Sequence, residues 1–461
     1  MKIDRPPKGF AIFLLVGPSV IWASEFVGSG EVILATRTGA IIGTSVIWAV
    51  ITGIFLKYWI GMSGARYTVC TGEGMIDMFA RMPGPKNWAV WMVLAGQFAA
   101  GCIAIGSLAT AAGVFLGNLV GISTRLSGWI VTVFAFIVAW SGRFDWLKII
   151  MSLLVFIVLV GVFAISVRVF PGLTVFVNGL IPSGPVVPDW ALAKLPDNNP
   201  WREVLPLIGW GAGGFASQVW YSYWVMGAGY GAAGKSEYGK AADITHLKKL
   251  DKEEGIKLKG WCRVVYTDAT LALVIGIFAT LGFLLAGAGI LRPLHLAPEG
   301  TKAALEIASI FSTQWGRFGG LLFMLGGTAA LVSTQVGQLA GWPRILADCT
   351  RICIPAFRKK LQWKWQFRIF LIFFFFSNMI IIYSLGYKPV FLVQLGAILD
   401  GLVLTPLQAL WIFTGLYFVM PKFYSREVSA ILRPHWIFGF LLFMAFLVFA
   451  YFCIFQLPYI L

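Results

Sequence analysis

The sequence predicts an all-α polytopic membrane protein of about eleven transmembrane helices. The predicted arrangement is a 5+5 inverted repeat with broken helices 1 and 6 and one extra C-terminal helix. Of its 461 residues, 59% are hydrophobic and only 12% are charged, whereas a typical soluble protein carries roughly 25% charged residues. Apolar runs of ~20 residues, long enough to cross a bilayer as helices, recur along the chain. Two of these runs are interrupted in a matched way.

The apolar segments define the predicted helices and their grouping. The first set covers 10–169, the second covers 203–419, and the last segment is extra; all form one transmembrane domain over 1–461. Because five is an odd number, the second set begins on the opposite side of the membrane, which produces an inverted repeat. The predicted spans lie near 10–34, 40–64, 88–117, 127–141, 147–169, 203–230, 262–289, 313–341, 367–385, 390–419 and 435–457.

The basic residues predict the orientation of the chain. Most of the 36 Lys and Arg residues fall in the predicted inner loops or at inner helix ends, Lys57 among them. By the positive-inside rule, this bias predicts an integral cell membrane protein with a cytoplasmic N-terminus and an outer C-terminus. The net charge of +16 is therefore attributed to topology and anionic lipid, and no nucleic-acid partner is expected.

Two apolar segments are broken near their middle by glycines and polar residues. The first is interrupted by Ser24-Glu25-Phe26-Val27-Gly28-Ser29-Gly30-Glu31, and the second by Gly209-Trp210-Gly211-Ala212-Gly213-Gly214-Phe215-Ala216-Ser217-Gln218. Irregular backbone at bilayer depth is tolerated only where protein or a watery cavity satisfies its polar groups. Matched interruptions in the two halves of a chain indicate the binding site of a transporter.

Carboxylates inside the membrane are the first candidates for this site, because a buried charge in a bilayer is costly and usually functional. Glu31, at the first break, is the strongest candidate for an ion or metal ligand; the alternative is a carboxylate that caps the second half-helix. Glu25 is expected either to face the same cavity or to pair with a base such as Arg37. Asp268 is expected to make a structural or gating hydrogen bond.

The other candidates come from the later segments. Asp400 or Gln394 is expected to supply a ligand from the tenth span. At the second break Gln218 is a candidate metal ligand, and its alternative is a hydrogen bond to the unwound backbone. The remaining candidates for substrate or ion binding are Phe215, Ser217 and the free backbone carbonyls of Gly28 and Gly213.

Several motifs resemble the natural resistance-associated macrophage protein (Nramp) family of metal transporters. The resemblance covers nearly the whole chain and implies the fold of the amino acid–polyamine–organocation superfamily, with substrate held between broken spans one and six. It is carried by Gly17-Pro18, the break at Gly28–Glu31, Gly39, Ser63-Gly64-Ala65-Arg66, Thr71-Gly72-Glu73-Gly74, Tyr266-Thr267-Asp268-Ala269, and Ser333-Thr334-Gln335 with Gly337-Gln338-Leu339-Ala340-Gly341.

The sequence departs from that family at the centre of the site. Where the family has Asp-Pro-Gly-Asn, this chain has Gly28-Ser29-Gly30-Glu31, so the metal-binding Asp is absent. Where the family has Met before Pro-His-Asn, it has Phe215-Ala216-Ser217-Gln218. Losing the thioether and the imidazole while gaining a carboxylate favours a hard cation such as Mg²⁺ or Mn²⁺. The third span lacks the acidic residues of typical members, which leaves proton coupling open.

The resulting expectation is a secondary transporter that moves a divalent metal cation by alternating access. One alternative is a small organic substrate, an amine or amino acid, because Trp22, Trp210 and Trp220 lie near the breaks and aromatic rings attract organic cations. Another is a non-transporting membrane sensor on the same scaffold. No enzyme activity and no cofactor are expected. The expected partners are the transported cation or small molecule and the lipid bilayer; the oligomeric state is left open.

Overall fold

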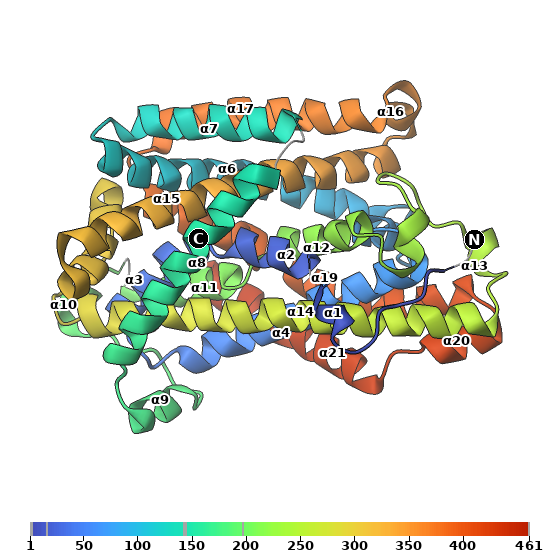
Figure 1. Cartoon of the computed structure of the whole chain (residues 1–461), viewed down its shortest axis with the longest axis horizontal. Helices are drawn as coiled ribbons and strands as arrows, with labels where there is room; N and C mark the ends of the chain where they lie inside the picture. Colours follow the sequence, from blue (N-terminus) through green and yellow to red (C-terminus); the bar gives the residue numbers. More distant parts are fainter. Residues whose placement is uncertain (1–2, 15–16, 142–144, 196–197, 460–461) are drawn as a thin grey trace.

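The computed structural model describes residues 3–14, 17–141, 145–195 and 198–459, and within these ranges it contains helices and no strands. The long helices run roughly along the longest axis of the molecule (Figure 1). Eight of the described helices are long and apolar enough to cross a membrane, and the bent pair Val155–Arg168 and Leu173–Gly179 raises the number to nine. The halves of the two broken helices are individually too short to be counted in this way.

The helices of the first half are grouped around a broken first span. In chain order they are α1 (Ala11–Leu14), α2 (Pro18–Phe26), a π-helical turn (Gly30–Ala35), α3 (Thr36–Ile41), α4 (Ile47–Thr71), α5 (Met75–Phe79), α6 (Trp88–Val120), α7 (Thr124–Ser141), α8 (Asp145–Arg168), α9 (Leu173–Gly179) and α10 (Asp189–Leu192).

The second half begins with another broken span. Its helices are α11 (Trp201–Trp210), α12 (Phe215–Gly227), α13 (Ile244–Leu247), α14 (Lys252–Ala286) continued by a π-helical turn (Gly287–Leu291), α15 (Ala303–Cys353), α16 (Pro355–Lys360), α17 (Trp363–Leu385), α18 (Pro389–Gly401), α19 (Thr405–Thr414), α20 (Arg426–Leu432) and α21 (Trp436–Tyr451).

The first two spans begin and end later in the chain than their hydrophobicity predicts. The first transmembrane helix starts at Pro18 instead of residue 10, because proline at the first helical position lacks an N–H that would be unpaired there anyway. It continues through α3, and residues 15 and 16 lie outside the described part. Gly43, with a φ of 81°, follows in a left-handed conformation that favours glycine and lies between α3 and α4. The second span is therefore α4, at 47–71 instead of 40–64.

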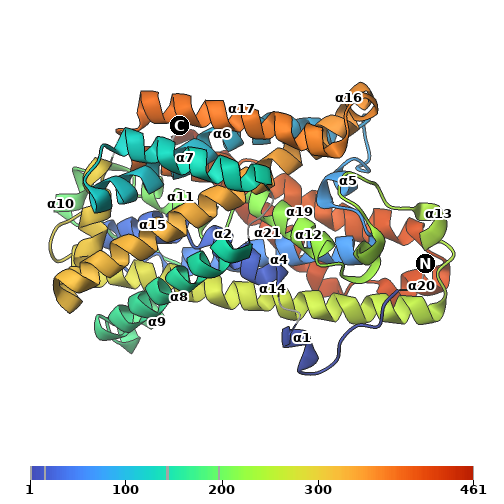
Figure 2. The same ribbon diagram turned by 45° about the horizontal axis from the view of Figure 1, so that its top comes forward.

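The broken helices lie at the centre of the bundle. The half-helix α12 packs against α2 and α4, and α11 packs against α18 and the π-helical turn after the first break. On one side α6 and α15 pack together, and α7 and α17 form a layer over α6 (Figure 2). The α15 segment consists of two helices that meet at a kink, because the backbone of Trp315 and Gly316 is not helical. The second of these helices is the eighth span, and it continues to Cys353, beyond the predicted end at 341.

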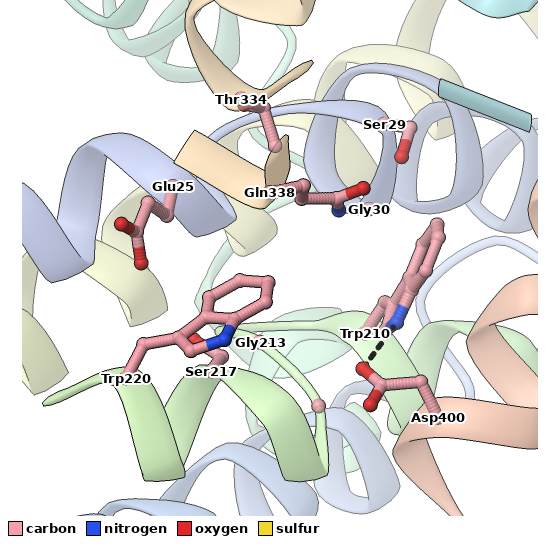
Figure 3. A pocket seen from close by; sticks show the side chains of 11 residues that line it. Glu25, Ser29, Gly30, Trp210, Gly213, Ser217, Trp220, Thr334, Gln338 and Asp400 are labelled. Carbon is pink, nitrogen blue, oxygen red and sulfur yellow. Dashed lines mark hydrogen bonds between the residues drawn. The ribbon is translucent and has the colours of Figure 1, made fainter. Parts of the chain in front are cut away.

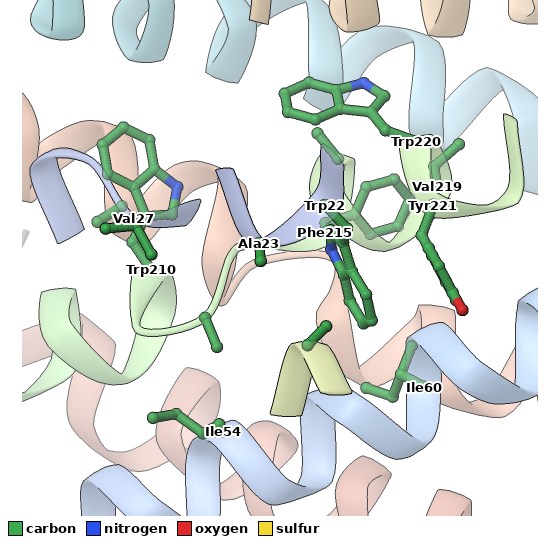
Figure 4. Close-up of a cluster of buried hydrophobic side chains, with 14 of the residues drawn as sticks. Trp22, Ala23, Val27, Ile54, Ile60, Trp210, Phe215, Val219, Trp220 and Tyr221 are labelled. Carbon is green, nitrogen blue, oxygen red and sulfur yellow. The ribbon is translucent and has the colours of Figure 1, made fainter. Parts of the chain in front are cut away.

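Aromatic side chains join α2 and α12, which are one half of each broken helix. Trp22 of α2 stacks on Tyr221 of α12, with ring centroids 4.3 Å apart, and both side chains are buried among residues of α4 (Figure 4). Asp268 of α14 accepts hydrogen bonds from Ser19 at 2.9 Å and from Tyr221 at 2.7 Å. This carboxylate therefore connects both half-helices to α14, as expected for a structural hydrogen bond.

Candidate functional site

Both predicted breaks are present, and they touch each other. Helix α2 ends at Phe26 and helical structure resumes with the π-helical turn at Gly30; α11 ends at Trp210 and α12 begins at Phe215. Ala212, in the second break, has a φ of 55°, which is unfavourable for a residue with a Cβ atom and is found where surrounding structure enforces it. A Cβ atom on Gly30 would lie 2.9 Å from the carbonyl oxygen of Trp210. Glycine at this position therefore allows the two breaks to approach.

A small polar cavity lies between the breaks (Figure 3). Its volume is about 30 Å³, which is enough for about two water molecules or ions of similar size. It is therefore of the size of an ion with few waters and far smaller than the roughly 300 Å³ or more of a typical pocket for an organic ligand. The residues that line it are Glu25, Ser29, Gly30, Trp210, Gly213, Gly214, Ser217, Trp220, Thr334, Gln338 and Asp400.

Two carboxylates from different helices line this cavity. Asp400 of α18 accepts hydrogen bonds from the Trp210 indole N–H and from the backbone N–H of Ala216, both at 3.0 Å. The second bond places the carboxylate at the N-terminus of α12, where the helix dipole favours an anion. Glu25 of α2 lies across the cavity (Figure 3) and accepts a bond from Trp224 Nε1 at 3.3 Å. Glu25 and Asp400 therefore face the same cavity, and their roles as ion ligands stay predictions.

Neutral oxygen atoms complete the lining. The amide of Gln338 points into the cavity (Figure 3), and its Oε1 atom is buried without a hydrogen-bond partner among the described residues. A buried acceptor without a donor is unfavourable, and a cation in the cavity would satisfy it. The Ser217 hydroxyl also lines the cavity while accepting a bond from Trp22 Nε1 at 2.8 Å. Gln338 was not among the candidate ligands predicted from the sequence, although it lies in one of the motifs quoted above.

Glu31 connects the two breaks and does not line the cavity. Its side chain is fully buried. Oε1 accepts hydrogen bonds from the backbone N–H of Ala212 at 3.0 Å and from the Thr280 hydroxyl at 3.2 Å. Oε2 lies 3.4 Å from the backbone N–H of Gly28. The structure therefore places the expected principal ligand in a role that resembles the alternative, a carboxylate that satisfies unwound backbone.

A lysine from α4 fills the second break. The Nζ atom of Lys57 donates hydrogen bonds to the carbonyl oxygens of Gly209 at 3.1 Å, Gly213 at 2.7 Å and Gly211. The side chain is 1% exposed. The prediction that Lys57 lies at an inner helix end is wrong: the residue lies within α4 and its head group lies in the core. The available signal was a lysine inside an apolar span, because such a charge usually has a partner in the protein.

The four remaining candidates are not among the residues that line the cavity. Gln394 lines a different cavity and donates a hydrogen bond to Glu203 at 3.1 Å. The ring of Phe215 packs near Phe79, and the backbone carbonyl oxygen of Phe215 accepts a hydrogen bond from Gln408 at 3.2 Å. Gln218 is fully buried, and its amide has no hydrogen-bond partner among the described residues. Gly28 faces Thr334, whose hydroxyl oxygen would lie 2.5 Å from an added Cβ atom.

Arg37 pairs with Glu203 and not with Glu25. Its guanidinium donates to both carboxylate oxygens at 2.9–3.0 Å and to the carbonyl oxygen of Pro298 at 2.6 Å. This buried pair joins α3 to α11 beside a second, larger cavity of about 530 Å³ that also contains Gln394. At the other end of the broken helices, Arg351 of α15 pairs with Asp77 of α5 at 2.5 Å. The central cavity therefore lies between two buried ion pairs.

The donor set of the central cavity is hard. In the part of the chain that the structure describes, no group of three or more His, Cys, Asp and Glu residues is arranged to hold a metal. The cavity instead offers two carboxylates, an amide oxygen and hydroxyl groups. Oxygen donors of this type suit Mg²⁺, Ca²⁺ and Mn²⁺ better than late transition metals.

Comparison with solved structures defines the fold class. A single-residue mutant of the Eremococcus coleocola manganese transporter superposes with a TM-score of 0.60 and 15% identity, covering 98% of this chain and 90% of that chain. MHP1, a nucleobase-cation-symport-1 family transporter with bromovinylhydantoin bound, gives 0.57 and 13%, covering 96% and 93%. MhsT in complex with L-phenylalanine also gives 0.57 and 13%, covering 96% and 99%. The chain shares the 5+5 inverted-repeat fold of these transporters.

Sequence comparisons point to one family within this fold. The family model described as natural resistance-associated macrophage protein-like matches residues 19–193. The divalent metal cation transporter MntH of Yersinia enterocolitica is 27% identical over 93 residues, which span 20% of this chain and 23% of that protein. These two matches support a divergent relationship to the Nramp family, and the chain is an integral membrane protein.

Proposed function

We propose that this protein is a secondary transporter that moves a hard divalent metal cation, Mg²⁺ or Mn²⁺, across the membrane by alternating access. The observation that carries the proposal is the cavity between the two breaks, where Glu25 and Asp400 face a space lined by oxygen atoms. The unpaired oxygen of Gln338 provides a third donor. Mg²⁺ commonly keeps several waters and needs only one or two carboxylates from a protein.

An organic substrate is the second candidate, because the cavity also contacts Trp210 and Trp220. The rings of these residues offer faces for a cationic amine. A volume of about 30 Å³ supports the ion, since an amino acid would need the cavity to enlarge considerably. The indole of Trp210 is also already engaged as a donor to Asp400, which supports a role in orienting the carboxylate.

Two buried ion pairs supply candidate gates for alternating access. Arg37 and Glu203 join the outer half of the first span to the sixth span, in the orientation with a cytoplasmic N-terminus. Arg351 and Asp77 lie at the inner end. Since each pair bridges separate helices, opening either side requires one pair to separate while the other holds. We propose this orientation together with repeats at 10–169 and 203–419 and an extra helix at 435–457.

Uptake into liposomes tests the proposed function directly. Purified protein would be reconstituted with fluorophores that report Mg²⁺ and Mn²⁺ inside the vesicles, and a pH dye would be run in parallel. We expect saturable influx of at least one of these ions, and loss of that influx in the Glu25→Gln/Asp400→Asn double variant. Glu427→Gln is the matched control, because the side chain of Glu427 is 61% exposed and lies on α20, away from the cavity.

The outcome separates the two candidates. Influx that is equal in the double variant and the control would refute the cavity assignment. Absence of influx for both metals, with correctly folded protein, would refute the metal proposal, and exchange of labelled amines and amino acids would then test the organic candidate. The pH signal would show whether protons accompany the metal although the third span lacks carboxylates.

A further inference from the structure

The Lys57 ammonium lies where the sixth span is unwound. Its three hydrogen-bond acceptors are the carbonyl oxygens of Gly209, Gly211 and Gly213. An ammonium group has three donors and no acceptor, so this contact set uses its full capacity. The acceptors come from a stretch that continues into the unwound backbone, where the helix no longer satisfies its carbonyl groups.

Carbonyl oxygens in this situation form a cation site. In transporters with broken helices, unwound carbonyls and half-helix ends coordinate inorganic coupling cations. The carbonyls of Gly209, Gly211 and Gly213 converge on one point, and the ammonium of Lys57 occupies that point. The charges of Glu31 and Asp400 also act on Lys57. The surroundings are therefore those of a bound monovalent cation, with the cation attached to α4.

We propose that Lys57 is a built-in cation that replaces a free monovalent ion at the sixth-span break. It holds the unwound backbone in shape, and it keeps Na⁺ and K⁺ out of this position. The uptake arm of the test rests on the proposed function, whereas the stability arm does not.

The same geometry connects Lys57 to the central cavity. Gly213 accepts a bond from Lys57 and also lines the cavity, and Gly214, which follows it, lies against Asp400. A cation at the position of Lys57 therefore fixes the backbone at Gly213 and Gly214, and Gly214 contacts the candidate ligand Asp400. Removing the ammonium should weaken metal uptake even though Lys57 does not line the cavity.

Two variants separate a cation site from a general packing role. Lys57→Ala removes the ammonium and leaves space for a free ion and water. Lys57→Met removes the charge but keeps a long side chain that fills the space. Both variants leave the three carbonyls without their donor, so both should lower the melting temperature in choline chloride. Only Lys57→Ala should recover as NaCl replaces choline chloride at constant ionic strength, because a ligand that binds the native state stabilises it by mass action.

Wild-type protein provides a test that does not depend on the folding of the variants. Its melting temperature should not respond to exchange of choline for Na⁺ or K⁺, because the position is already occupied. In liposomes, Mn²⁺ uptake by Lys57→Ala should fall about tenfold or more in choline and recover in Na⁺, whereas Lys57→Met should stay low in both. Saturable stabilisation of the wild type by Na⁺ would overturn the proposal, whether or not the variants fold.

Two further outcomes would also overturn it. One is a folded Lys57→Ala protein that no monovalent cation stabilises. The other is equal recovery of the alanine and methionine variants, since this would show a salt effect that is unrelated to the vacated position. If no metal is transported by any form of the protein, the proposed function fails, while the melting experiments still decide the role of Lys57.

Discussion

Replacing Asp400 by asparagine is the sharpest perturbation of the candidate ion site. The substitution keeps the size of the side chain and removes one negative charge from a carboxylate that lines the cavity. An asparagine oxygen can still accept from either Trp210 Nε1 or the backbone N–H of Ala216, the two donors that now lie at 3.0 Å. The fold should therefore survive with a modest loss of stability, about 1–2 kcal/mol.

The effect on ion binding should be larger. Two unit charges about 4 Å apart attract each other by ~4 kcal/mol at an effective dielectric constant of about 20, and the gross term doubles for a divalent ion. Dehydration of the ion cancels much of this attraction, and Glu25 and Gln338 remain in place. We expect a net loss of ~2.7 kcal/mol, which corresponds to a Kd about 100-fold weaker.

The Kd can be measured by titrating detergent-solubilised protein with Mn²⁺ and following the electron paramagnetic resonance signal of the free ion. Glu31→Gln is the informative comparison, because it also neutralises a buried carboxylate near the breaks but one outside the cavity lining. Its Kd should change by less than that of Asp400→Asn. An Asp400→Asn protein that binds Mn²⁺ as tightly as the wild type, or a Glu31→Gln protein that alone loses binding, would refute the reasoning.

Three further predictions concern the site and its two ends. Gly214→Ala should strongly reduce metal uptake, because an added Cβ atom would lie 2.1 Å from Asp400 Oδ2 and displace the carboxylate; unchanged uptake would contradict this. Glu203→Gln should cost roughly 3–5 kcal/mol of stability, since it leaves Arg37 buried without its counter-charge; a melting temperature equal to that of the wild type would exclude a strong ion pair. Burial raises the pKa of Asp77 above its ordinary value although Arg351 opposes the shift, so the folded protein binds a proton at this carboxyl more tightly than the unfolded chain, and stability should fall as the pH rises above about 4. Asp77→Asn should flatten this part of the curve measured by thermal melting, and an unaltered slope would show that other groups cause it.

Local sequence was sufficient for the helices and for both breaks. Runs of apolar residues define membrane helices because every backbone group in the bilayer must be satisfied internally. Glycines within those runs locate the unwound stretches at Gly28 and at Gly211–Gly214 for the same reason. The predicted ends of the first two spans were less accurate. Pro18 and Gly43 determine these ends through their backbone conformation, whereas the hydrophobic stretch continues across both positions.

The assignment of individual side chains needed the three-dimensional arrangement of the helices. The sequence places Glu31 at the first break and Lys57 in the second span. Their neighbours in the sequence do not show that Glu31 accepts a hydrogen bond from Ala212 or that Lys57 donates to carbonyl groups of the sixth span. These partners are 181 and 156 positions away along the chain. Similarly, Arg37 was a possible partner of Glu25, but helix packing places it against Glu203.

Neighbouring residues were enough to establish a membrane-embedded bundle of helices with two breaks, because hydrophobicity and helix interruption are properties of short stretches of chain. Packing between distant helices then settled that Glu25, Gln338 and Asp400 share a cavity while Glu31 and Lys57 support the backbone around it. A buried charge is stable beside whichever donors or acceptors packing brings to it, and these groups come from segments that lie far apart in the chain.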